Sequence, residues 1–216
     1  SPGNSLPNDN LLSLFWNAVW TNRITETEDG LLSLSSGWGS SGVSSLYPRK
    51  CYFDLINTIC NNPQFTKFLV LGSPGIGKSL FVYYFIYWTV KQNLLSTEKP
   101  SFVFSNLDGT EFLFTFDQND NRPIVLLYER SMEMPQYFIS DAFSKHDPPF
   151  RKAYIHISSF AKPHHESLQK EISEKGRTWN MPVFSFDEYL KITKFPEDFI
   201  KSRFKYDVFG GSARLL

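Results

Sequence analysis

The chain has 216 residues, of which 41% are hydrophobic, 17% aromatic and 20% charged, a composition typical of a folded domain rather than a disordered one. Its 22 basic and 22 acidic side chains balance, so no overall charge favours nucleic acid or an anionic membrane. Residues 151–216 nevertheless contain 12 Lys and Arg against 8 Asp and Glu. We interpret this excess as ordinary solvated side chains, with contact to phosphates as the alternative.

Residues 1–45 are expected to form an N-terminal extension. The first ten residues are rich in Pro, Asn and Gly and are expected to fray, whereas 11–20 is apolar enough for a short docking helix. The Ser- and Gly-rich stretch 32–45 predicts a linker or mobile loop. The main domain is therefore predicted to span 46–216, and the abrupt end of the chain suggests that it is truncated at its C-terminal end.

A helix with one apolar stripe is predicted over 47–62. Cys51 and Cys60 lie nine residues apart on it, too far for a disulfide across a straight helix. We expect both to be buried thiols of a reducing compartment. No secretory signal is visible, and the longest apolar run, 80–90, is too short to cross a membrane.

The central motif lies between a predicted buried strand over 67–72 and a predicted helix over 78–92 that is apolar on nearly all sides. The sequence Gly72-Ser-Pro-Gly-Ile-Gly-Lys78-Ser79 matches the phosphate-binding pattern G-x-x-x-x-G-K-[ST] at every fixed position. A strand before the motif and a helix after it are the context that this pattern requires.

Each residue type of the motif has a chemical reason. Glycine lets the backbone wrap around phosphate oxygens and reach positive φ, and the loop N–H groups then point inward at the positive end of the helix. Lys78 supplies a charge for the β- and γ-phosphates, and Ser79 supplies a hydroxyl for Mg²⁺. We therefore expect a nucleoside triphosphate, ATP favoured, and Mg²⁺. The predicted nucleotide-binding set is Gly72, Ser73, Pro74, Gly75, Ile76, Gly77, Lys78, Ser79 and Leu80.

Further strands follow along the chain. Alternation on both sides of Asp108-Gly109 predicts a β-hairpin over 101–116. Buried strands are predicted over 123–130 and 152–159. Two more helices are predicted, an amphipathic one over 164–173 and one over 185–193 with a Ser185–Glu188 capping box. The order of strand, glycine loop, helix and further strands predicts a three-layer α/β fold with a mainly parallel sheet and an inserted hairpin.

A hydrolysing loop of this kind needs an acid at the end of a neighbouring strand to hold Mg²⁺ and orient water. The candidate strand is 123–130, where Tyr128 stands in the position at which Asp is expected. Glu129 is therefore the predicted metal ligand or general base, and a solvent-facing charge pair with Arg130 is the alternative. Glu133 is a weaker candidate.

Three other regions are candidates for contact with the nucleotide. Ser158 or Ser159, at the end of strand 152–159, is predicted near the γ-phosphate, with an ordinary turn hydroxyl as the alternative. Arg49 precedes the motif, where a base or ribose would rest. Arg214 follows a double glycine and is a candidate catalytic arginine, a group that can accelerate phosphoryl transfer ~10³–10⁵-fold. The alternative is that Arg49 and Arg214 are surface arginines.

The residue patterns that other kinds of catalytic or metal site require are absent from the sequence. Zinc sites need clustered Cys and His, whereas His164 and His165 form an isolated adjacent pair. A restriction-type nuclease needs an acid-x-Lys step, and no Asp or Glu of this chain has Lys two positions later. There is no G-x-S-x-G nucleophile motif.

The chain contains, in this order, the segments LYPRKCYFDLI, FLVLGSPGIGKSLFVYYFIYWTV, FVFSNLDGTEFLFTF, RTWNMPVFSFDEY and VFGGSARLL. In this order of segments the sequence resembles Crinkler effectors, and it also resembles the related retrotransposon hot spot proteins of trypanosomatids. The resemblance covers roughly residues 46–216. Its most specific parts are the aromatic helix after the motif, the W-x-MP element (Trp179, Met181, Pro182) and the terminal FGG-x-x-R.

The resemblance implies a P-loop NTPase domain akin to AAA+ and STAND ATPases. In such effectors this domain is often joined to a nuclease-like domain, and the secreted protein acts inside a host cell, commonly in the nucleus. By this likeness Lys78 and Ser79 take the nucleotide and Mg²⁺ roles, Glu129 falls near the acidic position, and Arg214 is the arginine after the double glycine. The implied partners are DNA or a host nuclear protein, bound through regions outside these residues, and a homo-oligomer; no membrane is expected.

Three functions remain open from the sequence. The first is a Mg²⁺-dependent NTPase that drives or gates a partner domain. The second is a nucleotide-bound switch without useful turnover. The third is an interaction scaffold whose basic C-terminal region contacts DNA and whose motif is structural.

Overall fold

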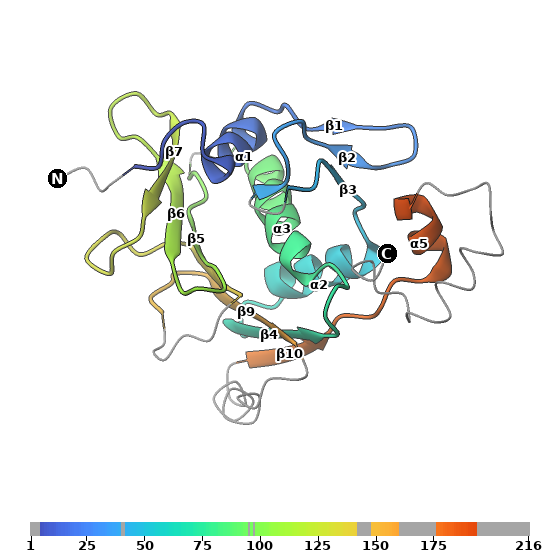
Figure 1. The fold of residues 1–216 in the computed structure, drawn as a ribbon. Helices are drawn as coiled ribbons and strands as arrows, with labels where there is room; N and C mark the ends of the chain where they lie inside the picture. Colours follow the sequence, from blue (N-terminus) through green and yellow to red (C-terminus); the bar gives the residue numbers. More distant parts are fainter. Residues whose placement is uncertain are drawn as a thin grey trace.

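The structure, a computed structural model of the chain, describes residues 5–39, 42–94, 96, 98–141, 148–159 and 176–193. Within these residues it contains four helices and two sheets (Figure 1). The helices are α1 (Leu11–Trp20), α2 (Lys50–Asn61), α3 (Lys78–Gln92) and α5 (Phe186–Thr193). The strands are β1 (Thr25–Glu26), β2 (Leu32–Ser33), β3 (Ser45–Leu46), β4 (Lys67–Gly72), β5 (Phe102–Ser105), β6 (Glu111–Phe116), β7 (Pro123–Leu127), β8 (Tyr137–Ser140), β9 (Ala153–Ser159) and β10 (Gly176–Asn180).

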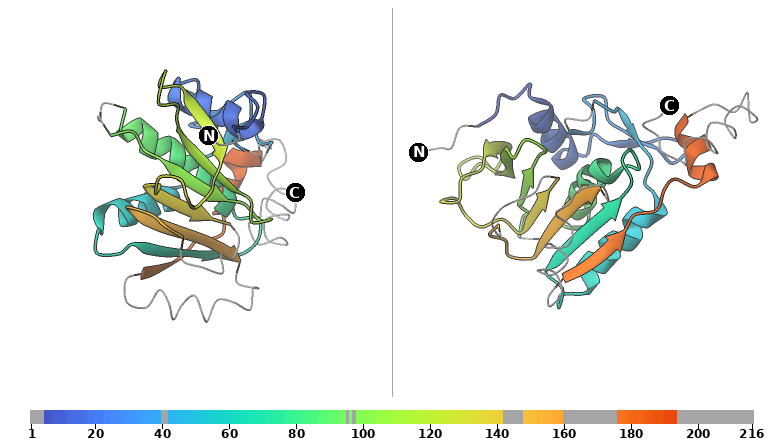
Figure 2. Two further views of the ribbon diagram at one scale, coloured as in Figure 1. Left: turned by 90° about the vertical axis from the view of Figure 1, so that its left-hand side faces the viewer. Right: turned by 60° about the horizontal axis from the view of Figure 1, so that its bottom comes forward.

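The main sheet has seven strands in the order β10-β4-β9-β8-β5-β6-β7, and its first five strands are parallel. β5 and β6 form the predicted antiparallel hairpin around Asp108-Gly109, and β7 pairs antiparallel with β6. The prediction of an α/β fold with a mainly parallel sheet and an inserted hairpin is confirmed. The predicted third layer is not seen among the described residues, whose helices α1, α2 and α3 lie on one face of the sheet (Figures 1 and 2).

Helix α3 lies at the centre of the molecule, which explains why it is apolar on nearly all sides. Toward the sheet, the ring of Phe85 contacts the ring of Tyr137 on β8 with centroids 5.2 Å apart. On another side, Tyr83 contacts Phe15 of α1 at 5.2 Å. Figures 1 and 2 show α1, α2 and α3 on the same face of the sheet. The bounds of β4 and α3 agree with those predicted from the sequence.

The described residues before α2 contribute to this core. Phe15 and Trp16 are fully buried, and the indole N–H of Trp16 donates to the carbonyl of Thr115 on β6 at 2.8 Å. Trp38 is also fully buried, although it lies in the Ser- and Gly-rich stretch that was predicted to be a linker or mobile loop. That prediction is wrong for the described part of 32–45, where Trp38 lies in the same hydrophobic core cluster as Phe15 and Trp16. The packing of the described residues shows no boundary at residue 45.

Helix α2 carries both cysteines, and both are free, as predicted. Cys51 is buried, and this burial raises the pKa of its thiol to about 11. Cys60 is exposed, so the prediction that both thiols are buried is wrong for this residue.

Two strands of the main sheet, β8 and β10, were not predicted from the sequence. The segment 123–130 was predicted to be a buried strand, but β7 is an edge strand of the sheet and Leu127 is exposed. The predicted helix 164–173 and the terminal 209–216 lie outside the described residues. Among the residues that are described, no helix is long and apolar enough to span a membrane.

Candidate functional site

The glycine loop, residues 72–79, connects β4 to α3 at the carboxyl end of the parallel strands. Gly77 caps α3 with φ of +89°, in the left-handed region. A Cβ atom at this position would collide with the hydroxyl of Tyr52. A side chain at residue 77 is thus disfavoured both by the backbone conformation and by the neighbour.

Two side chains of the segment 49–52 hold the carbonyls of the loop. The guanidinium of Arg49 donates to the carbonyl of Ile76 at 2.8 Å, and the hydroxyl of Tyr52 donates to the carbonyl of Gly77 at 2.7 Å. Within a trans peptide the C=O and the following N–H point in opposite directions, and the described chain contains no cis peptide. Drawing these two carbonyls toward α2 therefore turns the N–H groups of Gly77 and Lys78 away from it.

Lys78 lies over the same loop. Its ammonium donates to the carbonyls of Gly72 at 2.8 Å and Ser73 at 2.7 Å. The positive charge is thereby held beside the N-terminus of α3, where the helix dipole is also positive. This combination favours an anion with several acceptor oxygens, such as a phosphate chain.

Asp141 is the acid that the structure brings to the loop. Its carboxylate accepts a hydrogen bond of 2.7 Å from the hydroxyl of Ser79, and its own N–H donates to the carbonyl of Ser105 on β5 at 2.9 Å. Asp141 directly follows β8, which lies two places from β4 in the sheet. A carboxylate and a hydroxyl are hard oxygen donors of the kind that Mg²⁺ prefers, so this pair fits the expected metal.

The sequence analysis missed Asp141. The available signal was an acid directly after the apolar tetrapeptide Tyr137–Ser140. Four residues are too few to show a strand periodicity, and Pro135 with Gln136 before them resembles a loop.

Glu129 was predicted to lie at the loop, and the structure contradicts this placement. It follows β7, which is five places from β4, or about 24 Å at ~4.8 Å per strand. Tyr128, which seemed to occupy the position of an acid, is 8% exposed and packs its ring 6.3 Å from that of Phe138. The fallback candidate Glu133 pairs with Arg151 at the surface. The sequence does not reveal that β9, β8, β5 and β6 lie between β4 and β7 in the sheet.

Arg49 was predicted either to contact a nucleotide or to be a surface residue, and the structure supports neither. It is 1% exposed, and besides Ile76 its guanidinium donates to the carbonyls of Pro182 at 3.0 Å and Val183 at 2.9 Å. It also forms two hydrogen bonds of 3.2 Å with the carboxylate of Glu188. Arg49 therefore supports the loop from behind instead of facing a ligand.

Ser158 and Ser159 end β9, the strand between β4 and β8. The register pairs residue 159 with Gly72, so its backbone lies at the base of the glycine loop, while Ser158 is buried. Arg214, the predicted catalytic arginine, lies outside the described residues.

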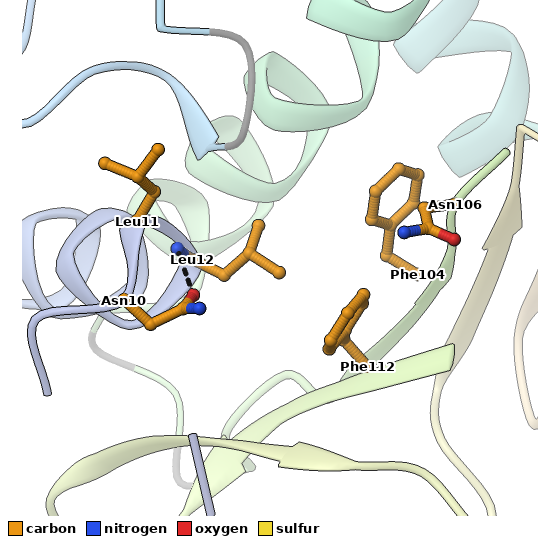
Figure 3. A pocket seen from close by; sticks show the side chains of 6 residues that line it. All are labelled: Asn10, Leu11, Leu12, Phe104, Asn106 and Phe112. Atoms are coloured by element: carbon orange, nitrogen blue, oxygen red, sulfur yellow. Dashed lines mark hydrogen bonds between the residues drawn. The ribbon is translucent and has the colours of Figure 1, made fainter. Parts of the chain in front are cut away.

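A cavity of about 210 Å³ lies between the start of α1 and the β5–β6 hairpin (Figure 3). It is lined by both apolar and amide side chains, and none of the predicted site residues lines it. The lining residues are Asn10, Leu11, Leu12, Phe104, Asn106 and Phe112.

No protein-family model matches the chain, and no curated protein matches it either. Functional assignment therefore depends on the geometry around the glycine loop.

Proposed function

We propose that the chain is a P-loop NTPase that binds a nucleoside triphosphate, with ATP favoured, together with Mg²⁺ at residues 72–79 and hydrolyses the β–γ bond. The observation that carries the proposal is the 2.7 Å hydrogen bond between Ser79 and Asp141. P-loop NTPases hold Mg²⁺ between the Ser or Thr of the loop and an Asp at the end of a nearby strand. Asp141 takes the metal role that the sequence had assigned to Glu129.

The sheet topology supports this location. From β4 the chain crosses to β5 on one side, whereas from β9 it continues to β10 on the other side of β4. In open α/β sheets ligands bind beyond the carboxyl ends of the strands at such a reversal. The glycine loop and the end of β9 lie at this reversal.

The residues divide the work of the proposed reaction. The loop N–H groups and Lys78 bind the β- and γ-phosphates and balance the charge that develops on them. Ser79 and Asp141 would hold Mg²⁺, which would neutralise part of the charge on these phosphates. Attack of water on the γ-phosphorus breaks its bond to the bridging oxygen and releases the nucleoside diphosphate and inorganic phosphate.

A second candidate is a nucleotide-bound switch with little turnover. The sequence after Asp141 favours it, because the next residue is Ala142 and no second carboxylate follows directly to orient water. In that case the same site binds nucleotide, and the bound state is long-lived.

The resemblance to Crinkler effectors suggests what the site would serve. We infer that nucleotide binding or hydrolysis gates a partner domain or partner protein that acts on nucleic acid or on host proteins. This part of the proposal rests on the resemblance alone.

The test is phosphate release from ATP with Mg²⁺ by the wild type and three variants. Lys78→Ala and Asp141→Asn are expected to lower the rate by ~10²-fold or more, because each removes a group that balances charge in the transition state. Glu129→Gln is the matched control, since it makes the same carboxylate-to-amide change far from the loop and is expected to retain full activity.

Equal rates for the wild type and Lys78→Ala would refute hydrolysis by these residues. Tight ATP binding together with that result would identify the switch. Loss of activity in Glu129→Gln but not in Asp141→Asn would restore the assignment made from the sequence and refute the present one.

A further inference from the structure

Arg49 connects three parts of the molecule that are distant in sequence. Its guanidinium bonds to the carbonyl of Ile76 in the glycine loop, to carbonyls of the segment that follows β10, and to Glu188 in the first turn of α5. The ring of Phe184 lies 4.0 Å from the guanidinium carbon, which adds a cation–π contact. A buried guanidinium with this many acceptors has a fixed position.

Glu188 is the acidic partner of this buried charge, in an ion pair of 3.2 Å. A buried charge without its partner is costly, so the position of Arg49 depends on Glu188 being in place. Glu188 is supplied by α5, which Figure 1 shows beyond the end of β10. The docking of α5 therefore affects the hydrogen bond that Arg49 donates to the carbonyl of Ile76.

The peptide group between Ile76 and Gly77 converts this contact into an effect on the loop. Its carbonyl is held by Arg49, and its N–H points in the opposite direction. If the guanidinium shifts, this peptide loses a hydrogen bond that fixes its orientation, and the N–H of Gly77 is no longer preorganised to meet an anion.

We propose that Arg49 is a positioning residue of the glycine loop and that, through Glu188, it couples nucleotide binding to the docking of α5. The ligand part of this inference rests on the proposed function. Because coupling between two sites is reciprocal, docking of α5 strengthens nucleotide binding and nucleotide strengthens docking of α5 to the same extent. Nucleotide binding at the glycine loop therefore changes how firmly the segment 181–193 docks.

Glu188 has a second role that the test must separate. Its carboxylate accepts the N–H of Ser185 at 2.8 Å, and the Ser185 hydroxyl accepts the N–H of Glu188 at 3.2 Å, which is the predicted capping box. Glutamine serves in capping boxes as well as glutamate. Glu188→Gln therefore keeps the cap and removes the charge that pairs with Arg49.

The experiment uses Glu188→Gln, Arg49→Lys and the matched control Asp187→Asn. Asp187 is an exposed acid in the same turn of α5, so its amide variant removes the same charge without touching Arg49. Lysine keeps the charge of Arg49 but lacks the planar fork that meets several acceptors. Hydrogen exchange is measured on peptides covering 76–81 and 186–193, without ligand and with Mg²⁺ and a non-hydrolysable ATP analogue, and the affinity for the analogue is measured by calorimetry.

Without ligand, Glu188→Gln and Arg49→Lys are expected to speed exchange in both segments, while Asp187→Asn leaves both unchanged. The affinity for the analogue is expected to fall about tenfold in the first two variants, as for the loss of one charge-assisted hydrogen bond. In the wild type the analogue should slow exchange over 186–193, and this effect should be lost in Glu188→Gln.

Faster exchange of α5 alone in Glu188→Gln, with 76–81 and the affinity unchanged, would overturn the proposal and leave the ion pair a merely structural contact. If the wild type binds no nucleotide, the proposed function fails, and the ligand part of the inference fails with it. The exchange comparison without ligand then still decides whether Arg49 and Glu188 position the glycine loop. Faster exchange of 76–81 in Asp187→Asn would also contradict it, because a general charge effect would then explain the result.

Discussion

At the scale of single residues, the glycine loop shows how far a local motif determines its own geometry. Gly77 has a backbone conformation that other residues rarely adopt, and the hydroxyl of Tyr52 occupies the place of its missing side chain. The same hydroxyl holds the Gly77 carbonyl. The left-handed backbone and the contact with Tyr52 therefore both disfavour a side chain at residue 77, and the free-energy cost of each can be measured separately.

We predict that Gly77→Ala lowers the free energy of unfolding by more than ~2 kcal/mol, since left-handed backbone alone costs about 1–2 kcal/mol for a non-glycine residue and the collision with Tyr52 adds to it. Gly109→Ala is the control: its φ is +84°, but a Cβ atom there meets nothing within 4 Å. Urea denaturation of both variants measures the difference. Equal losses would show that the contact with Tyr52 carries no energy.

The residues of the loop were predictable because all of them lie within eight consecutive positions. The capping box of Ser185 and Glu188 was predictable for the same reason. Asp141 was not, because it meets Ser79 across 62 positions of sequence. The buried position of Arg49 was not predictable either, because its partners Ile76 and Glu188 lie 27 and 139 positions away in the sequence.

At the scale of elements, α1, β2 and β3 contribute side chains to the core. Phe15 is fully buried, and its ring lies 5.2 Å from that of Tyr83 on α3 and 6.4 Å from that of Phe114 on β6. An appended extension would not place a side chain between the central helix and the sheet. The low complexity of 32–45 concealed this, because serine and glycine surround the one buried indole of Trp38.

We predict that Phe15→Ala destabilises the whole protein by ~3–5 kcal/mol, the usual cost of removing a buried aromatic ring. Leu14→Ala is the matched control, since the neighbouring side chain is 37% exposed and should cost less than ~1 kcal/mol. Circular dichroism follows the urea transition, and hydrogen exchange follows β4 and β9 separately. Loss of α1 without faster exchange in these strands would show that the first 46 residues are a separate unit.

At the scale of the whole molecule, the order of strands decides the site. Strand β8 follows β7 in the chain but lies next to β9, whereas β7 lies at the far edge. Local patterns correctly gave β4, β9 and the hairpin, since each of these has an apolar signal of its own. They could not give the lateral order, because pairing between distant segments depends on how the helices pack on the sheet and not on any single stretch.

The same order brings the carboxyl ends of β4, β9 and β8 to one edge, beside the start of α3. Ser79 and Asp141 meet there, and Arg49 supports the loop from the opposite side. The central claim is that this pair holds the Mg²⁺ of a bound nucleotide.

The most direct test is the affinity of the wild type, Asp141→Asn and Glu129→Gln for a non-hydrolysable ATP analogue, measured by calorimetry with and without Mg²⁺. We predict that Mg²⁺ tightens binding at least ~tenfold in the wild type and in Glu129→Gln, as expected for a metal that bridges the phosphates, and has no effect in Asp141→Asn. A full Mg²⁺ effect in Asp141→Asn, or its loss in Glu129→Gln, would contradict the account.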